Sequence, residues 1–594
     1  MNRPSRNDDT EDHPHWNQSP HALSGDLTTR ADLNGIVNLR EQRENESSLD
    51  NNEQDQINTQ PVNAPDPDAS ATKNPSTVQV DPRDQHQTPT DADLTAFQQQ
   101  PPPPPPSPVP YHSSRSWVFP NSNAGRSRPK RILAKIFVTL QKYVKFIGPG
   151  FMIAVAYIDP GNYATDVQAG AETRYRHLFV ILLSNLFAIF LQSLCIKLGS
   201  VTGLDLAENC RKHLPKWLNI VLYLFAEAAI IATDIAEVIG SAIALNLLLH
   251  IPLVAGCAIT LVDVLILLLF YRPDGSMTRL RLFEYFVMGL VLGVMVCFCI
   301  QLSYIRDTTA GQVFKGYLPS AAVVEGNGIY LSCGIMGATV MPHSIFLGSG
   351  VVQPRLKQFD DQNGHIAAAV LGAESDDEDE KYRPSIYAIR ACLKYSIVEL
   401  ASSLFTFALF VNSAILIVSG ASLYPSTAAT DADLFGIHRL LSQNLSKAAG
   451  TLFALALLLS GTSAGIVCTM AGQMVSEGML HWTIKPWMRR LVTRSISIVP
   501  SIVIAGAIGR EGLNQALTAS QVVLSVILPF VTAPLVWFTS RSYIMTVPDE
   551  SGVRGGAVVN MRNGWVVTAL AVTIWLVLVV MNVALLVLVG LGKA

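Results

Sequence analysis

The chain has 594 residues and a formal net charge of −3 at pH 7; 49% of its residues are hydrophobic and 15% are charged. Soluble globular proteins carry about 25% charged residues, so this composition excludes a soluble enzyme, a secreted disulfide scaffold and a nucleic-acid-binding domain. The 8 cysteines include no CxxC pair and lie mostly in apolar stretches, which indicates small buried hydrophobic side chains.

Residues 1–132 are polar and rich in Asn, Asp, Gln, Ser, Thr and Pro. Such a segment cannot bury enough apolar surface to offset its chain entropy, so a disordered tail is predicted. The proline run at 101–106 favours a stiff polyproline II spacer over a docking site for SH3 or WW domains. The tail has no signal-peptide pattern and is expected in the cytosol, where trafficking or ubiquitin-ligase adaptors are candidate partners.

Residues 133–594 form the second predicted region, an all-α polytopic membrane domain. It contains about eleven apolar segments of roughly 18 or more residues, each long enough to cross a lipid bilayer. The segments fall at about 144–170, 177–199, 217–243, 252–271, 282–304, 327–351, 387–420, 448–476, 493–510, 515–539 and 564–591. We therefore expect an integral membrane protein that is not an enzyme and has no nucleic-acid partner.

The distribution of Lys and Arg predicts the orientation of these helices. If the N-terminus is cytosolic, the short cytosolic loops contain nearly twice as many Lys and Arg residues as the outer segments. This bias predicts a cytosolic N-terminus and an outer or lumenal C-terminus, in either the plasma membrane or an endosomal or vacuolar membrane. The sequon at Asn444 would then lie outside, where a glycan can be added.

Two of the predicted helices contain helix-breaking residues in the middle. The first contains Asp-Pro-Gly-Asn at 159–162, and the sixth contains Met-Pro-His at 341–343. Breaks at membrane depth are tolerated only where the freed backbone lines a cavity or is covered by protein. Because helices one and six each open a unit of five helices, the breaks occupy matching positions of two inverted halves. This pattern is typical of the central site of a transporter.

The residues at the two breaks indicate what this site binds. Asp159 is an ionisable residue near the bilayer centre, where such residues are costly and usually functional. Asn162 adds an amide oxygen, and unwinding frees backbone oxygens such as those of Ala156 and Ala338. Met341 adds a soft thioether, which suits Mn²⁺, Fe²⁺, Co²⁺ or Cd²⁺ but not Na⁺, Mg²⁺ or Ca²⁺. The alternative for Met341 alone is a core-filling side chain.

The two motifs resemble the signature motifs of the NRAMP family of divalent-metal transporters. The resemblance extends through most of residues 144–545 and includes the stretches 232–240, 471–478 and 520–525. The motif at 341–344, the long polar tail and the stretch 476–478 are similar to the fungal branch. The resemblance implies a LeuT-like fold of two inverted five-helix repeats plus an extra helix. It also implies proton-coupled import of Mn²⁺, Fe²⁺ and related ions such as Co²⁺ and Cd²⁺ toward the cytosol, with no cofactor besides the transported ions.

The resemblance also implies roles for individual residues. The implied metal ligands are Asp159, Asn162, Met341 and the backbone oxygen of Ala338, joined in some conformations by the backbone of Ala156 and the side chain of Gln521. The implied proton route consists of His343, Asp234, Glu237 and one arginine near the start of helix nine, for which Arg489, Arg490 and Arg494 all qualify. The chain departs from many relatives at Thr462, where a glutamine is common, and at Gly348, where a second histidine is common.

The residues of the proton route have alternative interpretations. Asp234 and Glu237 are spaced i, i+3 and share one helix face, which suggests a relay or a structural ion pair with an arginine of another helix. His343 can change charge at mildly acidic pH, or it is a neutral histidine that is hydrogen-bonded within the bundle. The acidic run at 376–380 is expected to be a solvated loop.

Several other functions compete with metal transport. A metal sensor or receptor with the same fold is the main alternative, and we expect it less because the chain shows no soluble effector domain. A Mg²⁺ or Al³⁺ carrier is disfavoured by Met341, and a Na⁺-coupled amino-acid carrier is disfavoured by Asp159 together with Met341. An ATP-driven pump is excluded because the sequence contains no P-loop.

Overall fold

The computed structural model describes residues 148–260, 277–306, 308–364, 382–424, 433–480, 486–548 and 558–591. All of them belong to one of the two units into which the chain divides, Val118–Ala594. The predicted tail at 1–132 and the acidic run at 376–380 lie outside the described residues.

The described residues form a bundle of helices. The first half of the chain contributes α2 (Pro149–Ala156), α3 (Pro160–Thr173), α4 (Leu178–Thr202), α5 (Leu206–His213), α6 (Lys216–Leu249), α7 (Leu253–Ile259), α9 (Met277–Tyr304) and α10 (Ala310–Gly316). The second half contributes η1 (Ala321–Val323), α11 (Gly328–Thr339), α12 (Pro342–Gly350), α13 (Gln353–Asn363), α15 (Ile386–Ser403), η2 (Leu404–Ala408), α16 (Leu409–Ser422), α17 (Leu434–Leu440), η4 (Leu441–Leu445), α18 (Lys447–Leu480), α19 (Pro486–Ala507), α20 (Arg510–Ser540) and α21 (Trp565–Gly590).

Among the described residues, 8 helices are long and apolar enough to cross a membrane. The three other predicted spans have identifiable counterparts. The first predicted span is divided into α2 and α3. The fourth begins with α7, and its residues 261–271 lie outside the described part. The ninth corresponds to α19, whose apolar part is the shorter Leu491–Ala507. The predicted count of eleven spans therefore stays a prediction.

Both breaks lie where the sequence predicts them, and prolines begin the second half-helices. Asp159 is the N-cap of α3 and Pro160 is its first residue; Met341 is the N-cap of α12 and Pro342 is its first residue. Proline is favoured at this position because the first N–H of a helix has no intrahelical partner. Every residue from Pro149 to Val167 is buried, so the first break is enclosed by other helices.

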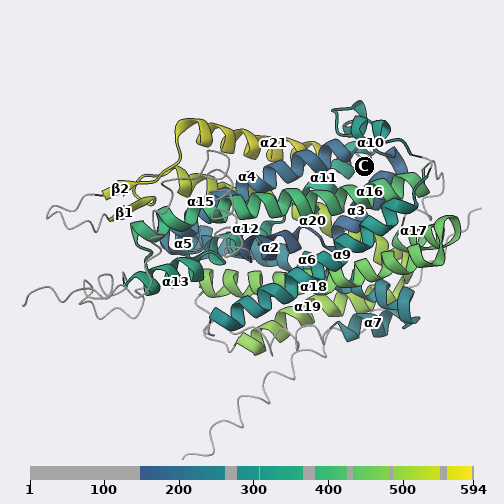
Figure 1. Cartoon of the computed structure of the whole chain (residues 1–594), viewed down its shortest axis with the longest axis horizontal. Helices are drawn as coiled ribbons and strands as arrows, with labels where there is room; N and C mark the ends of the chain where they lie inside the picture. Colours follow the sequence, from purple (N-terminus) through teal and green to yellow (C-terminus); the bar gives the residue numbers. More distant parts are fainter. Residues whose placement is uncertain are drawn as a thin grey trace, which may run out of the picture. The chain divides into compact units, whose positions relative to one another are not determined.

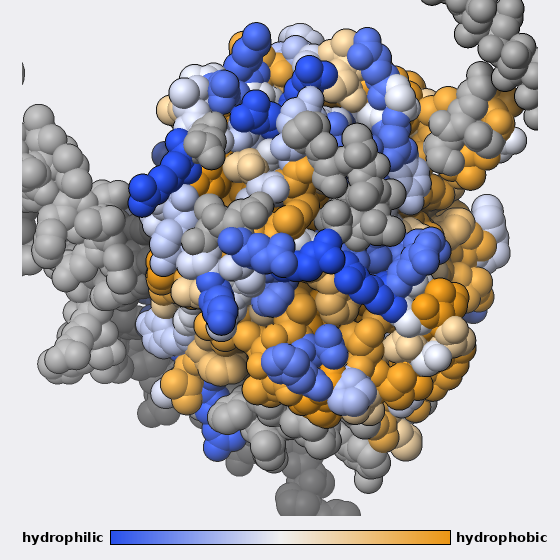
Figure 2. Space-filling view, turned by 90° about the vertical axis from the view of Figure 1, so that its right-hand side faces the viewer, coloured by the Kyte–Doolittle hydropathy of each residue, from blue (hydrophilic) through white to orange (hydrophobic). Residues whose placement is uncertain are grey.

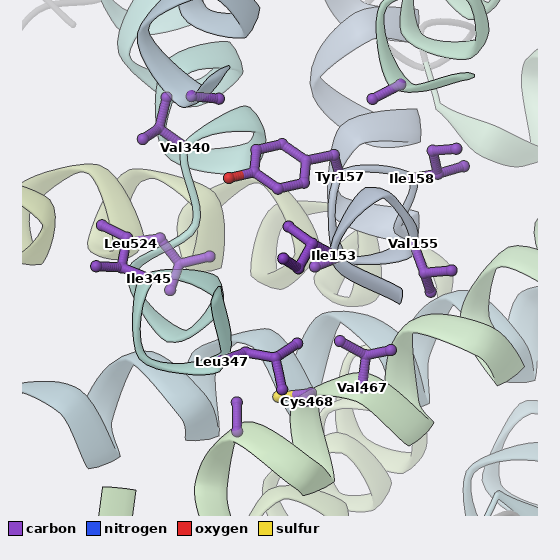
Figure 3. Close-up of a cluster of buried hydrophobic side chains, with 14 of the residues drawn as sticks. Ile153, Val155, Tyr157, Ile158, Val340, Ile345, Leu347, Val467, Cys468 and Leu524 are labelled. Atoms are coloured by element: carbon purple, nitrogen blue, oxygen red, sulfur yellow. The ribbon is translucent and has the colours of Figure 1, made fainter. Parts of the chain in front are cut away.

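The interrupted helices lie inside the bundle. Figure 1 shows α21 along one side and α7 with α19 along the opposite side, with α2, α3 and α12 between them. Only 22% of the most apolar 18-residue stretch of α21 is buried, whereas 94% of the corresponding stretch within Gly328–Asn363, the segment that contains α11 and α12, is buried. Figure 3 shows the packing beside the breaks, where Tyr157 reaches from the end of α2 toward the linker next to Val340.

The bundle has two distinguishable ends. We call one the α10–α17 end; α3 reaches it, because the Tyr175 hydroxyl just beyond α3 bonds Thr308 just before α10 over 2.6 Å. Figure 2 shows hydrophilic residues gathered at this end, next to extensive hydrophobic surface. The opposite end, the α5–α13 end, contains the start of α2 and a short hairpin (Figure 1).

The hairpin is a feature that an all-α prediction did not include. β1 (Thr546–Pro548) pairs antiparallel with β2 (Val558–Asn560), and Val547 lies opposite Val559. The two strands connect α20 to α21, outside the spanning helices. The predicted seventh helix is also not uniform, because the π-helix η2 separates α15 from α16.

Candidate metal site

Asp159 is a fully buried carboxylate at the first break. Its Oδ1 accepts hydrogen bonds from the backbone N–H of Asn162 at 2.9 Å and from the Asn162 side-chain Nδ2 at 2.6 Å. Its Oδ2 has no hydrogen-bond partner among the described residues. A buried carboxylate that keeps one oxygen unpaired is costly, and a bound cation would remove this cost.

Asn162 joins the two breaks. Its Nδ2 also donates to the backbone oxygen of Ala338 in α11 over 3.0 Å. Two oxygens from different breaks, Asp159 Oδ1 and Ala338 O, therefore converge on one donor group. A cation requires oxygens that converge on a single point, and here the amide N–H group of Asn162 occupies that point.

Asn412 of α16 is a member of this site that the sequence analysis missed. Its Nδ2 donates to the backbone oxygen of Tyr157 at 3.0 Å and to Asn162 Oδ1 at 3.4 Å. It thereby satisfies a carbonyl freed by the end of α2, while its own Oδ1 has no partner among the described residues. The available signal was the one amide side chain in a helix whose other polar residues are serines.

The remaining predicted ligands lie at or next to the breaks. Ala156 ends α2, and Met341 caps α12 with a fully buried side chain. Gln521 of α20 packs directly against Gly161, because a Cβ added at Gly161 would overlap the Gln521 amide. The Oε1 of Gln521 is buried and has no partner in the described part of the chain. The structure thus brings residues from α2, α3, α11, α12 and α20 to one region.

The predicted proton-route residues form a second buried cluster. Arg494 of α19 donates from Nη1 to Asp234 Oδ1 over 2.6 Å and to Glu237 Oε2 over 3.0 Å. All three side chains are at most 4% exposed. Arg494 is therefore the helix-nine arginine that pairs with the two acids, and the side chains of Arg489 and Arg490 lie outside the described residues.

His343 connects this cluster to the second break. It lies two residues after Met341, and its Nδ1 is 3.3 Å from the hydroxyl of Thr233, the residue before Asp234 in α6. Cys468 of α18 also lies close enough to Asp234 and Glu237 to complete a three-residue metal cluster. The guanidinium of Arg494 already pairs with both acids, so we assign no metal to them.

The two departures from the family pattern differ in their surroundings. Thr462 donates to Leu458 O of its own helix at 2.9 Å, which is its one side-chain hydrogen bond within the described residues. Gly348 packs against Gln192 of α4, and a Cβ at this position would overlap Gln192 Oε1. Gln192 Nε2 bonds both Tyr157 Oη at 3.0 Å and Ser344 Oγ at 3.0 Å, so it bridges the two interrupted helices where a second histidine is absent.

A further buried group lies at the start of α2, and the sequence analysis did not predict it. Glu399 of α15 accepts hydrogen bonds from the backbone N–H groups of Gly148 at 2.9 Å and Gly150 at 2.9 and 3.0 Å. A carboxylate at a helix N-terminus stabilises the helix dipole. The ion pair Glu284–Arg355, at 2.8 Å, encloses the same turn, because a Cβ at Gly148 would overlap both side chains.

The predicted glycosylation site Asn444 lies in the π-helix η4, which follows α17. Its side chain lies outside the described residues, so glycosylation stays a prediction.

The chain is similar to known proteins in sequence and in fold. Residues 150–588 match the family described as natural resistance-associated macrophage protein-like, Nramp. The manganese transporter SMF1 of Saccharomyces cerevisiae is 52% identical over 523 residues, which cover 80% of this chain and 91% of that protein. The manganese transporter pdt1 of Schizosaccharomyces pombe is 53% identical over 458 residues, covering 76% and 87%.

A solved structure is also similar. The manganese transporter of Eremococcus coleocola, in complex with an aromatic bis-isothiourea compound, superposes with a TM-score of 0.62 at 32% identity and covers 75% of this chain and 86% of that chain. The match confirms the predicted fold class, a LeuT-like all-α membrane bundle. The yeast relatives confirm the predicted similarity to the fungal branch.

Proposed function

Because the chain belongs to the NRAMP family as a multi-pass integral membrane protein, we propose that it is a proton-coupled secondary transporter. It imports divalent transition metals, foremost Mn²⁺ and Fe²⁺ and also Co²⁺ and Cd²⁺, toward the cytosol. Relatives named as manganese and iron transporters support the metal class, including the iron transporter SMF3 of Saccharomyces cerevisiae at 52% identity over 425 residues.

The observation that carries this proposal is the convergence of Asp159 Oδ1 and Ala338 O on the Asn162 amide. An arriving cation would take the place of the amide N–H groups, and Asn162 would then turn its Oδ1 toward the ion. Asp159 Oδ2, which is buried and has no hydrogen-bond partner among the described residues, is available at the same position. The site thus supplies one full negative charge and several neutral oxygens, which is enough to replace part of the ion's hydration shell.

Selectivity is proposed to come from Met341. Its fully buried side chain lies at the N-cap of α12, three residues after Ala338. A thioether is a soft ligand that stabilises Mn²⁺, Fe²⁺ and especially Cd²⁺, whereas Ca²⁺ prefers six to eight oxygens. Replacing one oxygen ligand by sulfur therefore disfavours Ca²⁺ and Mg²⁺ relative to transition metals.

The proposed proton route leads from the metal site to α6 and α19. His343 follows the metal ligand Met341 and contacts Thr233, next to the Asp234–Arg494–Glu237 cluster. Arg494 holds two carboxylates that are within one helical turn, and a proton on either acid would weaken its ion pair. Proton binding can thereby change how α19 packs on α6, at a place separate from the metal site.

The proposed inner gate is the start of α2. Glu399 holds Gly148 and Gly150, and the pair Glu284–Arg355 packs on the same turn. Release of the ion at the α5–α13 end requires the eight-residue half-helix α2 to leave these contacts. The short length of α2 makes such a movement possible without unfolding a long helix.

The test is uptake of Mn²⁺, Fe²⁺, Mg²⁺ and Ca²⁺ by proteoliposomes that contain the full chain, with and without an inward pH gradient. The proposal predicts uptake of Mn²⁺ and Fe²⁺ that accelerates with the gradient and acidifies the lumen. Binding of Mn²⁺ without any uptake would instead favour the alternative function of a metal sensor or receptor.

A further inference from the structure

Asp166 of α3 is a buried carboxylate that the proposed mechanism does not use. Its side chain is fully buried, and neither carboxylate oxygen has a hydrogen-bond partner among the described residues. None of the ion pairs formed within the described part of the chain includes it. A carboxylate buried without a partner is costly, so its presence calls for a ligand that binds there during function.

The position of Asp166 relates it to the metal site. It follows Asn162 by four residues and therefore lies on the same face of α3, one turn closer to the α10–α17 end. Helical side chains lean toward the helix N-terminus, so the carboxylate leans back toward Asn162. Asp166 is seven residues from Asp159, or about 10 Å along the helix, so the two carboxylates start from different levels of the bundle.

A second observation supports a ligand at this level. Gln301 of α9 is also fully buried, and neither its amide oxygen nor its amide nitrogen has a partner in the described part. The rings of Tyr163 and Phe298 meet at a centroid distance of 5.6 Å. Asp166 and Gln301 each follow one of these aromatic residues by three positions, so both lie one turn beyond the ring contact. α3 and α9 thus place two unsatisfied polar side chains at one level of the bundle.

We propose that Asp166 forms a second cation position, with Gln301 beside it, which holds a divalent metal ion on its way from the α10–α17 end to Asp159. This inference rests on the proposed function. The position has oxygen ligands and no thioether in its argued set, so it accepts Mn²⁺ and Ca²⁺ alike. Attraction of the ion occurs at Asp166, and selection against Ca²⁺ occurs afterwards at Met341.

The test measures Mn²⁺ binding to the purified full-length chain by electron paramagnetic resonance, which distinguishes free from bound Mn²⁺. Four proteins are compared: the wild type, Asp159→Ala, Asp166→Asn and the double variant. We expect Asp159→Ala to retain weak Mn²⁺ binding that Ca²⁺ competes away. The double variant should bind Mn²⁺ at least about tenfold more weakly than Asp159→Ala does. Asp166→Asn alone should raise the half-saturating Mn²⁺ concentration for uptake about tenfold, and Asp166→Glu should restore it.

The outcomes separate the two proposals. Identical residual binding in Asp159→Ala and the double variant overturns the second cation position and leaves the central site intact. A wild-type chain that neither binds nor transports Mn²⁺ overturns the proposed function itself. Asp166→Asn preserves the shape of the side chain, and thermal unfolding of each variant identifies a folding defect. Such a defect would lower the uptake of all ions equally, and Asp166→Glu would show it as well.

Discussion

The side-chain amide of Asn162 donates to the backbone oxygen of Ala338 over 3.0 Å and to the carboxylate of Asp159 over 2.6 Å. The contact with Ala338 holds the half-helices α3 and α11 at one level, and the contact with Asp159 lies within the first break. They also place a donor where the transported cation is proposed to bind. Metal binding and these two hydrogen bonds are therefore alternatives for the same two oxygens, Asp159 Oδ1 and Ala338 O.

Met341→Ala should change the order of ion preference and not only the rate. Loss of the thioether should reduce Cd²⁺ uptake most and Mn²⁺ uptake less, while Ca²⁺ begins to compete with Mn²⁺. Uptake of the three ions into proteoliposomes gives the ratios. A variant that keeps the wild-type order and still excludes Ca²⁺ would show that Met341 only fills the core.

Glu237→Gln should weaken the coupling of metal to protons while it leaves metal binding largely intact. Glu237 bonds Arg494 and not the metal-site residues, and glutamine keeps its shape but cannot accept a proton. His343→Ala should have the same effect through the other end of the proposed route. The measurement is lumenal acidification per Mn²⁺ taken up. An unchanged ratio in both variants would assign these residues to structure.

Arg494→Ala should destabilise the folded chain by about 3–5 kcal/mol, because it removes the cation that pairs with the buried acids Asp234 and Glu237. Adding Asp234→Asn and Glu237→Gln to Arg494→Ala should recover much of this loss. Thermal unfolding in detergent measures both variants. Equal stability of the single and triple variants would contradict the ion-pair geometry.

Asn412→Ala should lower stability by about 1–3 kcal/mol, because the freed carbonyl of Tyr157 loses its donor. Thr462→Val is the control, since its hydroxyl bonds only its own helix, and its effect should stay within about 0.5 kcal/mol. Two variants of equal stability would remove Asn412 from the proposed site.

Both breaks could be predicted from the sequence because Pro and Gly act locally on the backbone. The choice among Arg489, Arg490 and Arg494 could not, because all three lie near the start of one helix and only packing on α6 determines which one meets Asp234. Glu399 and Asn412 were missed for a related reason. Both helices contain other polar residues, and the function of Glu399 or Asn412 appears only when its partner, Gly148 or Tyr157, is placed beside it.

The role of Asp159 tests the account most directly, and calorimetric titration of Mn²⁺ into Asp159→Ala is the measurement. Asp159 is the only carboxylate within the two break motifs, and one of its oxygens is unpaired among the described residues. The account predicts that this variant keeps the wild-type unfolding temperature within a few degrees and loses high-affinity Mn²⁺ binding. Wild-type Mn²⁺ affinity in a folded Asp159→Ala chain would contradict it.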